Sequence, residues 1–251
     1  MRILTCAFIF FFHSLLLTAM ANEVRVAVAS NFLATLNEIT KTFERDTGHG
    51  VTISSGSSGK LYAQIRHGAP FDVFFSADVE RPRRLEAEGL VAQGSRFTYA
   101  VGRLTLWSAD PNLITKDGKM ILSKRRLDYL AMANPKTAPY GAAAKSTLQG
   151  LGMWEAWKDR VVQGENIAQT FQFVFSHNAQ LGFVARSQVL DPKLKGAGSH
   201  WDVPVDLYAP LRQQAVLLVN SQQAKAASAF LDYVKQTKSR EIIERFGYGV
   251  E

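Results

Sequence analysis

Stretches with two different hydrophobic periods alternate along the chain. In residues 23–29 (EVRVAVA) every second position is a valine, and a period of two predicts a strand. Over residues 32–48 apolar side chains recur every three or four positions, which predicts a helix, and Ser30 or Asn31 is placed to cap it. The chain after its leader therefore opens with a strand, a short turn and a helix.

The same unit is repeated in the first hundred residues. The pattern predicts further strands at 50–54 and 72–76 and further helices at 60–67 and 79–88. The strand at 72–76 is a nearly continuous apolar run, as expected for a strand covered on both faces. Strands that alternate with helices imply parallel βαβ units and an α/β domain.

The rest of the chain continues in this way. The elements expected there are strands at 97–108, 127–133 and 181–185, a strand region at 206–219 with an apolar run at 215–219, and helices at 141–151, 166–178, 223–234 and 239–246. The long strand at 97–108 is expected to leave the first domain. About ten alternating elements exceed what one modest sheet carries, so the layout predicts two α/β lobes.

The first twenty-one residues predict an export signal. Arg2 supplies a positive start, residues 3–17 are almost entirely apolar, and Ala19 and Ala21 stand at the two positions that determine cleavage. The alternative is an uncleaved anchor, but the apolar run is shorter than the roughly 20 residues that span a bilayer. Cleavage would remove Cys6, the only cysteine, so we expect an exported, periplasmic, cysteine-free protein.

The composition indicates the charge of the binding partner. The 251 residues are 47% hydrophobic and 20% charged, which excludes disordered, collagen-like and disulfide-rich classes, and the net charge of +7 favours an anion. Arg81, Arg83 and Arg84 are interleaved with glutamates, and the aromatic residues fall mostly at core spacing. These charges are typical of solvated faces, so no nucleic acid is expected.

Four predicted helices begin directly after small or hydrogen-bonding residues. These starts are Ser30-Asn31, Ser57-Ser58-Gly59, Pro139-Tyr140-Gly141 and Asn166-Ile167. The first backbone N–H groups of a helix have no partner within it and carry partial positive charge. In parallel α/β sheets such helix starts meet at the carboxyl edge of the strands, so several of them together would bind an anion without a charged side chain.

Other chemistries fit less well. The turn before Lys60 resembles a phosphate loop, but Leu61 stands where that loop needs Ser or Thr. Neither G-x-S-x-G nor H-E-x-x-H occurs, and the histidines after the leader are scattered singly. An exported hydrolase that uses Ser58 with a histidine remains the alternative from another class; we expect a binding protein and no enzyme.

The chain resembles the periplasmic molybdate-binding proteins of ABC importers, a branch of the two-lobed solute-binding proteins. The similarity runs over nearly all of residues 23–250. It rests on V-A-V-A-S-N-F at 26–32, S-G-S-S-G-K-L at 55–61, G-A-P-F-D-V-F-F-S-A-D at 68–78, A-P-Y-G at 138–141, E-N at 165–166, L-G-F-V at 181–184 and R-F-G-Y at 245–248. The resemblance implies a type II periplasmic binding protein fold, each lobe a mainly parallel sheet flanked by helices.

The resemblance also implies the residues that hold the anion. By analogy these are Ser30 with Asn31, Ser58, Tyr140 and Ile167, each contacting the oxygens of the oxyanion and none ligating the metal directly. Some members carry a tyrosine after the L-G-x-V strand, where this chain has Ala185, so Tyr140 is expected to take over part of that role. The lobes are expected at 22–100 with 213–251 and at 101–212.

The function so implied is capture of molybdate or tungstate and delivery to the membrane permease of an ABC importer, by a monomer without a cofactor. Molybdate near neutral pH is a fully deprotonated dianion, so a site made only of donors suits it. Asp72 and Asp78 are read as structural caps and Lys60 as pointing to solvent. The alternative ligand is sulfate or another tetrahedral oxyanion.

Overall fold

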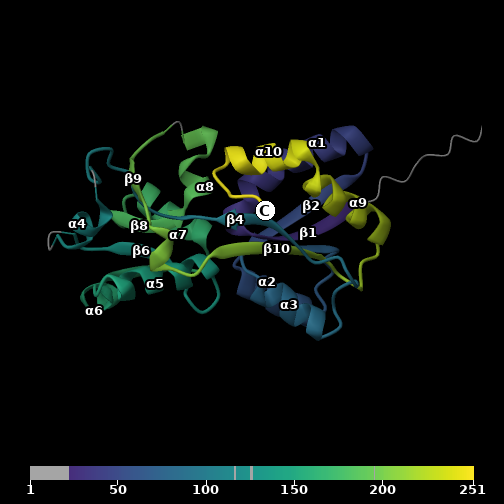
Figure 1. Ribbon diagram of the computed structural model, residues 1–251, viewed down its shortest axis with the longest axis horizontal. Coiled ribbons are helices and arrows are strands. Elements are labelled where there is room, and N and C mark those ends of the chain that lie inside the picture. Colours follow the sequence, from purple (N-terminus) through teal and green to yellow (C-terminus); the bar gives the residue numbers. More distant parts are fainter. Residues whose placement is uncertain (1–22, 116, 125–126, 195) are drawn as a thin grey trace, which may run out of the picture.

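The computed structural model describes residues 23–115, 117–124, 127–194 and 196–251 (Figure 1). The predicted signal peptide, 1–21, lies outside these residues. Two five-stranded sheets lie side by side, each covered by helices, which confirms the α/β class expected from the alternating pattern. No helix in the described part of the chain combines the length and the apolar character needed to cross a membrane.

The first sheet has the strand order β2-β1-β3-β10-β4. Its strands are β1 Glu23–Ala29, β2 Gly50–Gly56, β3 Val73–Ser76, β4 Phe97–Gly102 and β10 Leu211–Leu217. β1 pairs in parallel with β2 and β3, whereas β10 runs antiparallel to β3 and β4. β10, which comes late in the chain, thus lies between strands from the first hundred residues.

Helices cover both faces of this sheet (Figure 1). One face carries α1 Leu33–Thr47, α9 Ala224–Lys235 and α10 Thr237–Arg245; the other carries α2 Ser58–Arg66 and α3 Glu80–Ala87. Phe43 of α1 packs edge-on against Phe230 of α9 with ring centroids 4.9 Å apart. The last two helices, α9 and α10, therefore share one hydrophobic core with α1.

The second sheet has the strand order β7-β6-β8-β5-β9. Its strands are β5 Leu104–Ser108, β6 Leu130–Ala133, β7 Val161–Gly164, β8 Leu181–Ala185 and β9 Ser199–Asp202. Its helices are α4 Gly118–Leu122, α5 Pro139–Gly150, α6 Trp154–Trp157, α7 Ile167–Phe175 and α8 Arg186–Val189. Short 3₁₀ turns complete the described chain at Ser30–Phe32, Lys158–Arg160, Pro192–Leu194 and Val205–Leu207.

The long strand expected at 97–108 is two strands in two sheets. β4 ends at Gly102, Arg103 follows, and β5 starts at Leu104 and pairs with β8 and β9 instead. Apolar residues recur on both sides of Arg103 because both halves are sheet strands, so periodicity alone hides the change of sheet. The expected lobe limits, after residue 100 and before residue 213, fall inside β4 and β10, within two residues of where these strands end and begin.

Several element boundaries also differ from the expectation. The helix predicted from 141 begins at Pro139, since proline has no N–H to lose and its fixed φ suits the first helical position. The side chains of Ser30 and Asn31 do not cap α1, because both residues lie in the 3₁₀ turn before it. The strand expected at 127–133 covers only 130–133. The short elements β7, β9, α4, α6 and α8 were not predicted.

Gly141 offers a test of why α5 approaches β6 so closely. A Cβ on Gly141 would overlap the backbone carbonyl of Ala133, whereas a Cβ on Gly150 in the same helix would lie 3.7 Å from Leu207. We expect Gly141→Ala to lower the free energy of unfolding by about 1–3 kcal/mol, as overpacking does. Gly150→Ala should leave it unchanged or raise it by about 0.5–1 kcal/mol. Urea denaturation of both variants measures the difference, and equal stabilities would contradict the close approach.

Candidate anion site between the two sheets

The carboxyl ends of parallel strands from both sheets face a small shared cavity. The cavity is lined by Ala29, Ser30, Asn31, Gly56, Ser57, Ser58 and Ala77 from the first sheet and its helices, and by Ala138, Pro139, Tyr140 and Ile167 from the second. All five residues that the sequence nominated for the anion are among them. The structure therefore brings together segments that are up to 137 positions apart.

Ser30 and Asn31 reach the cavity because β1 passes directly into a 3₁₀ turn. Ser30 is 8% exposed, and no hydrogen bond from its hydroxyl reaches another part of the described chain. The Asn31 amide is engaged: its Nδ2 donates to Gln213 Oε1 at 2.8 Å and to the Tyr248 hydroxyl at 3.0 Å. Ser30 thus presents a side-chain donor, whereas the Asn31 side chain fixes the turn.

Ser57 and Ser58, at the start of α2, have different hydrogen-bonding roles. Ser57 is the N-cap, and its hydroxyl oxygen accepts from the backbone N–H of Lys60 at 3.4 Å. Ser58 is buried, and its hydroxyl oxygen accepts from the backbone N–H of Ala77 at 2.9 Å. A hydroxyl that accepts a hydrogen bond still has its own proton to donate. Ser58 can therefore act as a donor in the cavity.

Tyr140 is the second residue of α5, directly after Pro139. Its backbone N–H has no partner within the helix, because the first N–H groups of any helix lack one. Its side chain is buried, and its hydroxyl accepts from Gln213 Nε2 at 3.2 Å. Burial raises the pKa of Tyr140 well above 10, so the phenol keeps its proton.

Ile167 begins α7, and its N-cap is Asn166. The Asn166 side-chain oxygen accepts from the N–H groups of Ala168 and Gln169, both at 3.0 Å. The N–H of Ile167, one position earlier, is left without a partner in the helix. The cap therefore makes Ile167 the backbone donor at this corner of the cavity.

Among the described residues, no carboxylate or cationic side chain lines the cavity. Asp72 accepts from the backbone N–H of Arg25 and from the Ser221 hydroxyl, and Asp78 accepts from the backbone N–H of Arg81 at the start of α3. Both aspartates are structural, as expected from the sequence. The positive potential of the site comes from helix starts, which favour an anion.

A set of contacts at the rim joins the two halves and was not foreseen. The backbone N–H of Gly59 donates to the carbonyl of Thr137 at 2.9 Å, and Lys60, half exposed, pairs with Glu165. A Cβ on Gly59 would lie only 2.9 Å from that carbonyl oxygen. The glycine in S-S-G-K is the signal that could have revealed this close approach.

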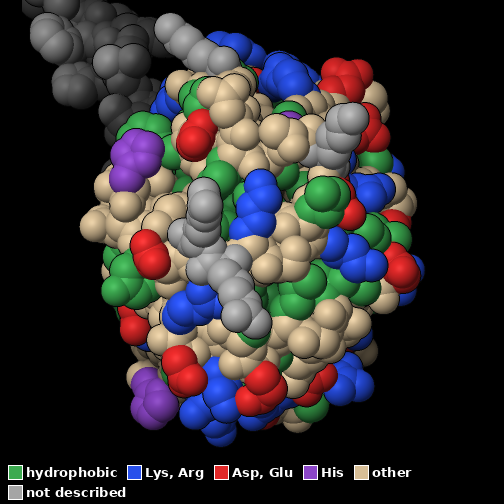
Figure 2. Space-filling model, turned by 90° about the vertical axis from the view of Figure 1, so that its left-hand side faces the viewer, with side chains coloured by type: hydrophobic (Ala, Val, Ile, Leu, Met, Phe, Trp, Pro, Cys, Tyr) green, Lys and Arg blue, Asp and Glu red, His purple; other side chains and the backbone are tan. Residues whose placement is uncertain are grey.

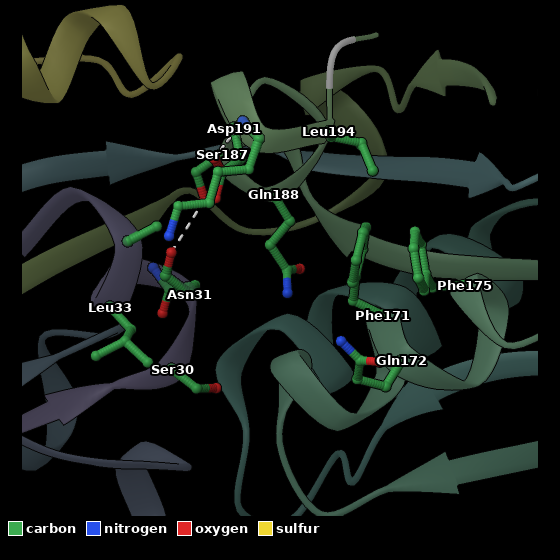
Figure 3. A pocket seen from close by; sticks show the side chains of 12 residues that line it. Ser30, Asn31, Leu33, Phe171, Gln172, Phe175, Ser187, Gln188, Asp191 and Leu194 are labelled. Carbon is green, nitrogen blue, oxygen red and sulfur yellow. Dashed lines mark hydrogen bonds between the residues drawn. The ribbon is translucent and has the colours of Figure 1, made fainter. Parts of the chain in front are cut away.

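A larger and mostly apolar cavity of about 320 Å³ adjoins the site (Figure 3). Ser30, Asn31 and Leu33 line one side of it, and Phe171 and Phe175 of α7 line the other. The Ser187 hydroxyl donates to the Asn31 carbonyl at 3.1 Å between them. The two halves thus contact each other behind the small cavity as well as at its rim.

The hydrolase alternative receives no support from this geometry. His49, His67, His177 and His200 do not line the small cavity, and all but His49 are exposed. The described residues contain no group of three histidine, cysteine, aspartate or glutamate side chains placed to hold a metal ion. On the end of the molecule shown in Figure 2, basic and acidic side chains are interspersed, which is typical of a solvated face.

Two α/β halves with a donor-lined cavity between them define a two-lobed solute-binding protein. Over residues 24–249 the chain matches the bacterial extracellular solute-binding proteins, and it belongs to that family. The molybdate-binding protein ModA of Azotobacter vinelandii is 53% identical, covering 93% of this chain and 92% of that protein. ModA of Rhodobacter capsulatus is 47% identical, covering 94% and 92%.

A solved structure shows the same fold. The periplasmic molybdate-binding protein of Azotobacter vinelandii superimposes with a TM-score of 0.87 at 42% identity, covering 91% of this chain and 99% of that chain. The expected periplasmic binding protein fold, and the family resemblance on which it rested, are thereby confirmed.

The Asn166 cap can be tested through stability. We expect Asn166→Ala to lower the free energy of unfolding by about 1 kcal/mol, because two helix N–H groups lose their acceptor. Asn166→Asp should retain most of the stability, since aspartate caps as well as asparagine does. The control is Asn178→Ala, at an exposed position after α7, which should change stability by less than about 0.5 kcal/mol. Thermal unfolding of the three variants would contradict the cap if all three were alike.

Proposed function

We propose that this protein captures molybdate or tungstate in the small cavity and delivers it to the membrane permease of an ABC importer. The observation that carries the proposal is a cavity between two lobes whose lining offers hydroxyl and helix-start N–H donors and, in the part of the chain that the structure describes, no charged side chain. Relatives at 53% and 47% identity that are named molybdate-binding proteins support the choice of ligand.

The chemistry of the lining favours a fully deprotonated dianion. Each oxygen of molybdate accepts hydrogen bonds and none donates, so every donor around it can be used. A partly protonated phosphate would also need an acceptor for its own proton. Among the described residues, no carboxylate that could accept this proton lines the cavity. Neutral donors also avoid the cost of burying a cation beside the anion.

The proposed contacts come from both lobes. The hydroxyls of Ser30 and Ser58 donate from the first lobe, and the backbone N–H groups of Tyr140 and Ile167 donate from the second. Asn31 donates to the anion through its backbone N–H, because its side-chain amide is hydrogen-bonded to Gln213 and Tyr248. All contacts are to oxygens of the anion, and none is to the metal atom.

The lobes are proposed to move about the two strand connections near Arg103 and Tyr208, where the chain passes between the sheets. Hinge closure of this kind would bring the four helix starts together only in the shut form. The contacts of Gly59 with Thr137 and of Lys60 with Glu165 belong to that form.

Export, the oligomeric state and the absence of catalysis complete the proposal. A cleaved signal at 1–21 would place the mature chain in the periplasm, in keeping with a family described as extracellular. We propose a monomer that needs no cofactor, has no enzymatic activity and binds no nucleic acid. The net charge, +7 for the full sequence and one less without Arg2 of the signal, assists the encounter with an anion but does not select it.

Calorimetric titration of the mature protein with four anions tests the ligand. We expect tight binding of molybdate and tungstate, as in the relatives named molybdate-binding proteins, and at least a hundredfold weaker binding of sulfate and phosphate. Phosphate has the further disadvantage that its proton finds no carboxylate acceptor among the described lining residues. Tight sulfate binding together with none for molybdate would refute the proposal.

Substitution of the serines tests the site. Ser30→Ala and Ser58→Ala should each weaken molybdate binding by about 1.5–3 kcal/mol, the usual value of a donor to a charged group. Ser57→Ala is the matched control, since that hydroxyl caps α2; it should lower stability by about 1 kcal/mol and change the affinity far less. If the Ser30 and Ser58 variants bind like the parent, these hydroxyls are structural only.

A further inference from the structure

Gln213 lies at the centre of a buried polar network behind the anion site. Its side chain, on β10, is fully buried. Its Oε1 accepts from Asn31 Nδ2 and from the Tyr99 hydroxyl, both at 2.8 Å. Its Nε2 donates to the Tyr140 hydroxyl at 3.2 Å. One amide thus connects the turn that carries Ser30 in the first lobe to the first turn of α5 in the second.

The network fixes the direction of each hydrogen bond. Asn31 Nδ2 can only donate, so the Gln213 atom facing it must be the acceptor Oε1. Nε2 then faces Tyr140, and the phenol oxygen must accept there. The Tyr140 proton is left free for another acceptor. Had the Gln213 amide the opposite orientation, two donors would face each other in the buried interior, which is costly.

We propose that Gln213 is a positioning residue of the anion site, which holds Asn31 and Tyr140 at a fixed separation. This proposal rests on the proposed function. It gives β10 a role in recognition although Gln213 does not line the cavity. The close fit extends to Gly102, where a Cβ would overlap both the Tyr140 hydroxyl and the Gln213 amide.

The groups that face Gln213 are neutral at working pH. The titratable ones are Tyr99 on β4, Tyr140 on α5 and Tyr248 after α10, and burial raises the pKa of all three above 10. The charge of Asp78 acts on Tyr99, and Asp78 is paired with Arg81. An acid introduced at position 213 would therefore be the only group of the network to titrate between pH 6 and 9.

Gln213→Glu is the test, read as the Kd for molybdate at pH 6, 7, 8 and 9. A protonated glutamic acid has one acceptor and one donor, as the amide has, whereas the carboxylate accepts only and repels the dianion. Burial brings the pKa of the new carboxyl into this range. We expect the ratio of variant to parent Kd to rise at least tenfold from pH 6 to pH 9, and by no more than tenfold per pH unit.

The matched control is Gln214→Glu, one residue along the same strand. Gln214 lies outside the network and accepts from Arg96 at 2.9 Å, so the same charge is added where a cation meets it. We expect its Kd to stay within twofold of the parent at every pH. Thermal unfolding of each variant at each pH confirms that the protein measured is folded.

A second variant removes the hydrogen bonds and retains the volume. Gln213→Met should weaken molybdate binding at least tenfold in the parent protein. In the Tyr140→Phe variant the same substitution should weaken binding much less, because the two residues act through one hydrogen bond. A constant Kd ratio for Gln213→Glu, or equal losses from Gln213→Met on both backgrounds, would overturn the positioning role. A parent protein that fails to bind molybdate would instead refute the proposed function.

Discussion

The first backbone N–H groups of a helix cannot be satisfied within that helix, and the architecture of this protein depends on where those groups point. The turn at Ser30–Phe32, α2, α5 and α7 each follow a parallel strand, so their starts meet at the carboxyl edges of the two sheets. Caps such as Asn166 satisfy the second and third N–H groups and leave the first one free. A neutral cavity with positive potential follows from backbone geometry.

Two kinds of contact join the lobes around this cavity, and they differ in strength. The pair of Lys60 with Glu165 is half exposed, and such pairs contribute about 0–1 kcal/mol. The network centred on Gln213 is buried and neutral, so its hydrogen bonds are sheltered from water and a lost partner is costly. The buried network therefore dominates the relative placement of Asn31 and Tyr140, while the rim pair adds little.

The residues proposed for the site were accessible to sequence reasoning because their signals are local. Ser58 and Ile167 stand at helix starts that capping residues and turns mark in the chain, and the family resemblance singled out the same positions. Boundaries were less accessible: Pro139 lies in the helix that was expected to begin at 141, and the run at 97–108 divides between two sheets at Arg103. β7 and β9 are as short as β3, but they contain polar residues where β3 is a nearly continuous apolar run, so neither a period nor an apolar run marks them in the sequence.

The sequence by itself determined the elements, the α/β class and the donors offered to an anion, because hydrophobic period and capping act over a few neighbouring residues. Only the tertiary structure decided which of the nominated side chains are already engaged within the protein. It engaged the Asn31 amide with Gln213 and Tyr248, placed β10 between strands from the first hundred residues, and brought Gly59 against Thr137. These outcomes depend on contacts between residues up to 217 positions apart, which leave no periodic trace in the chain.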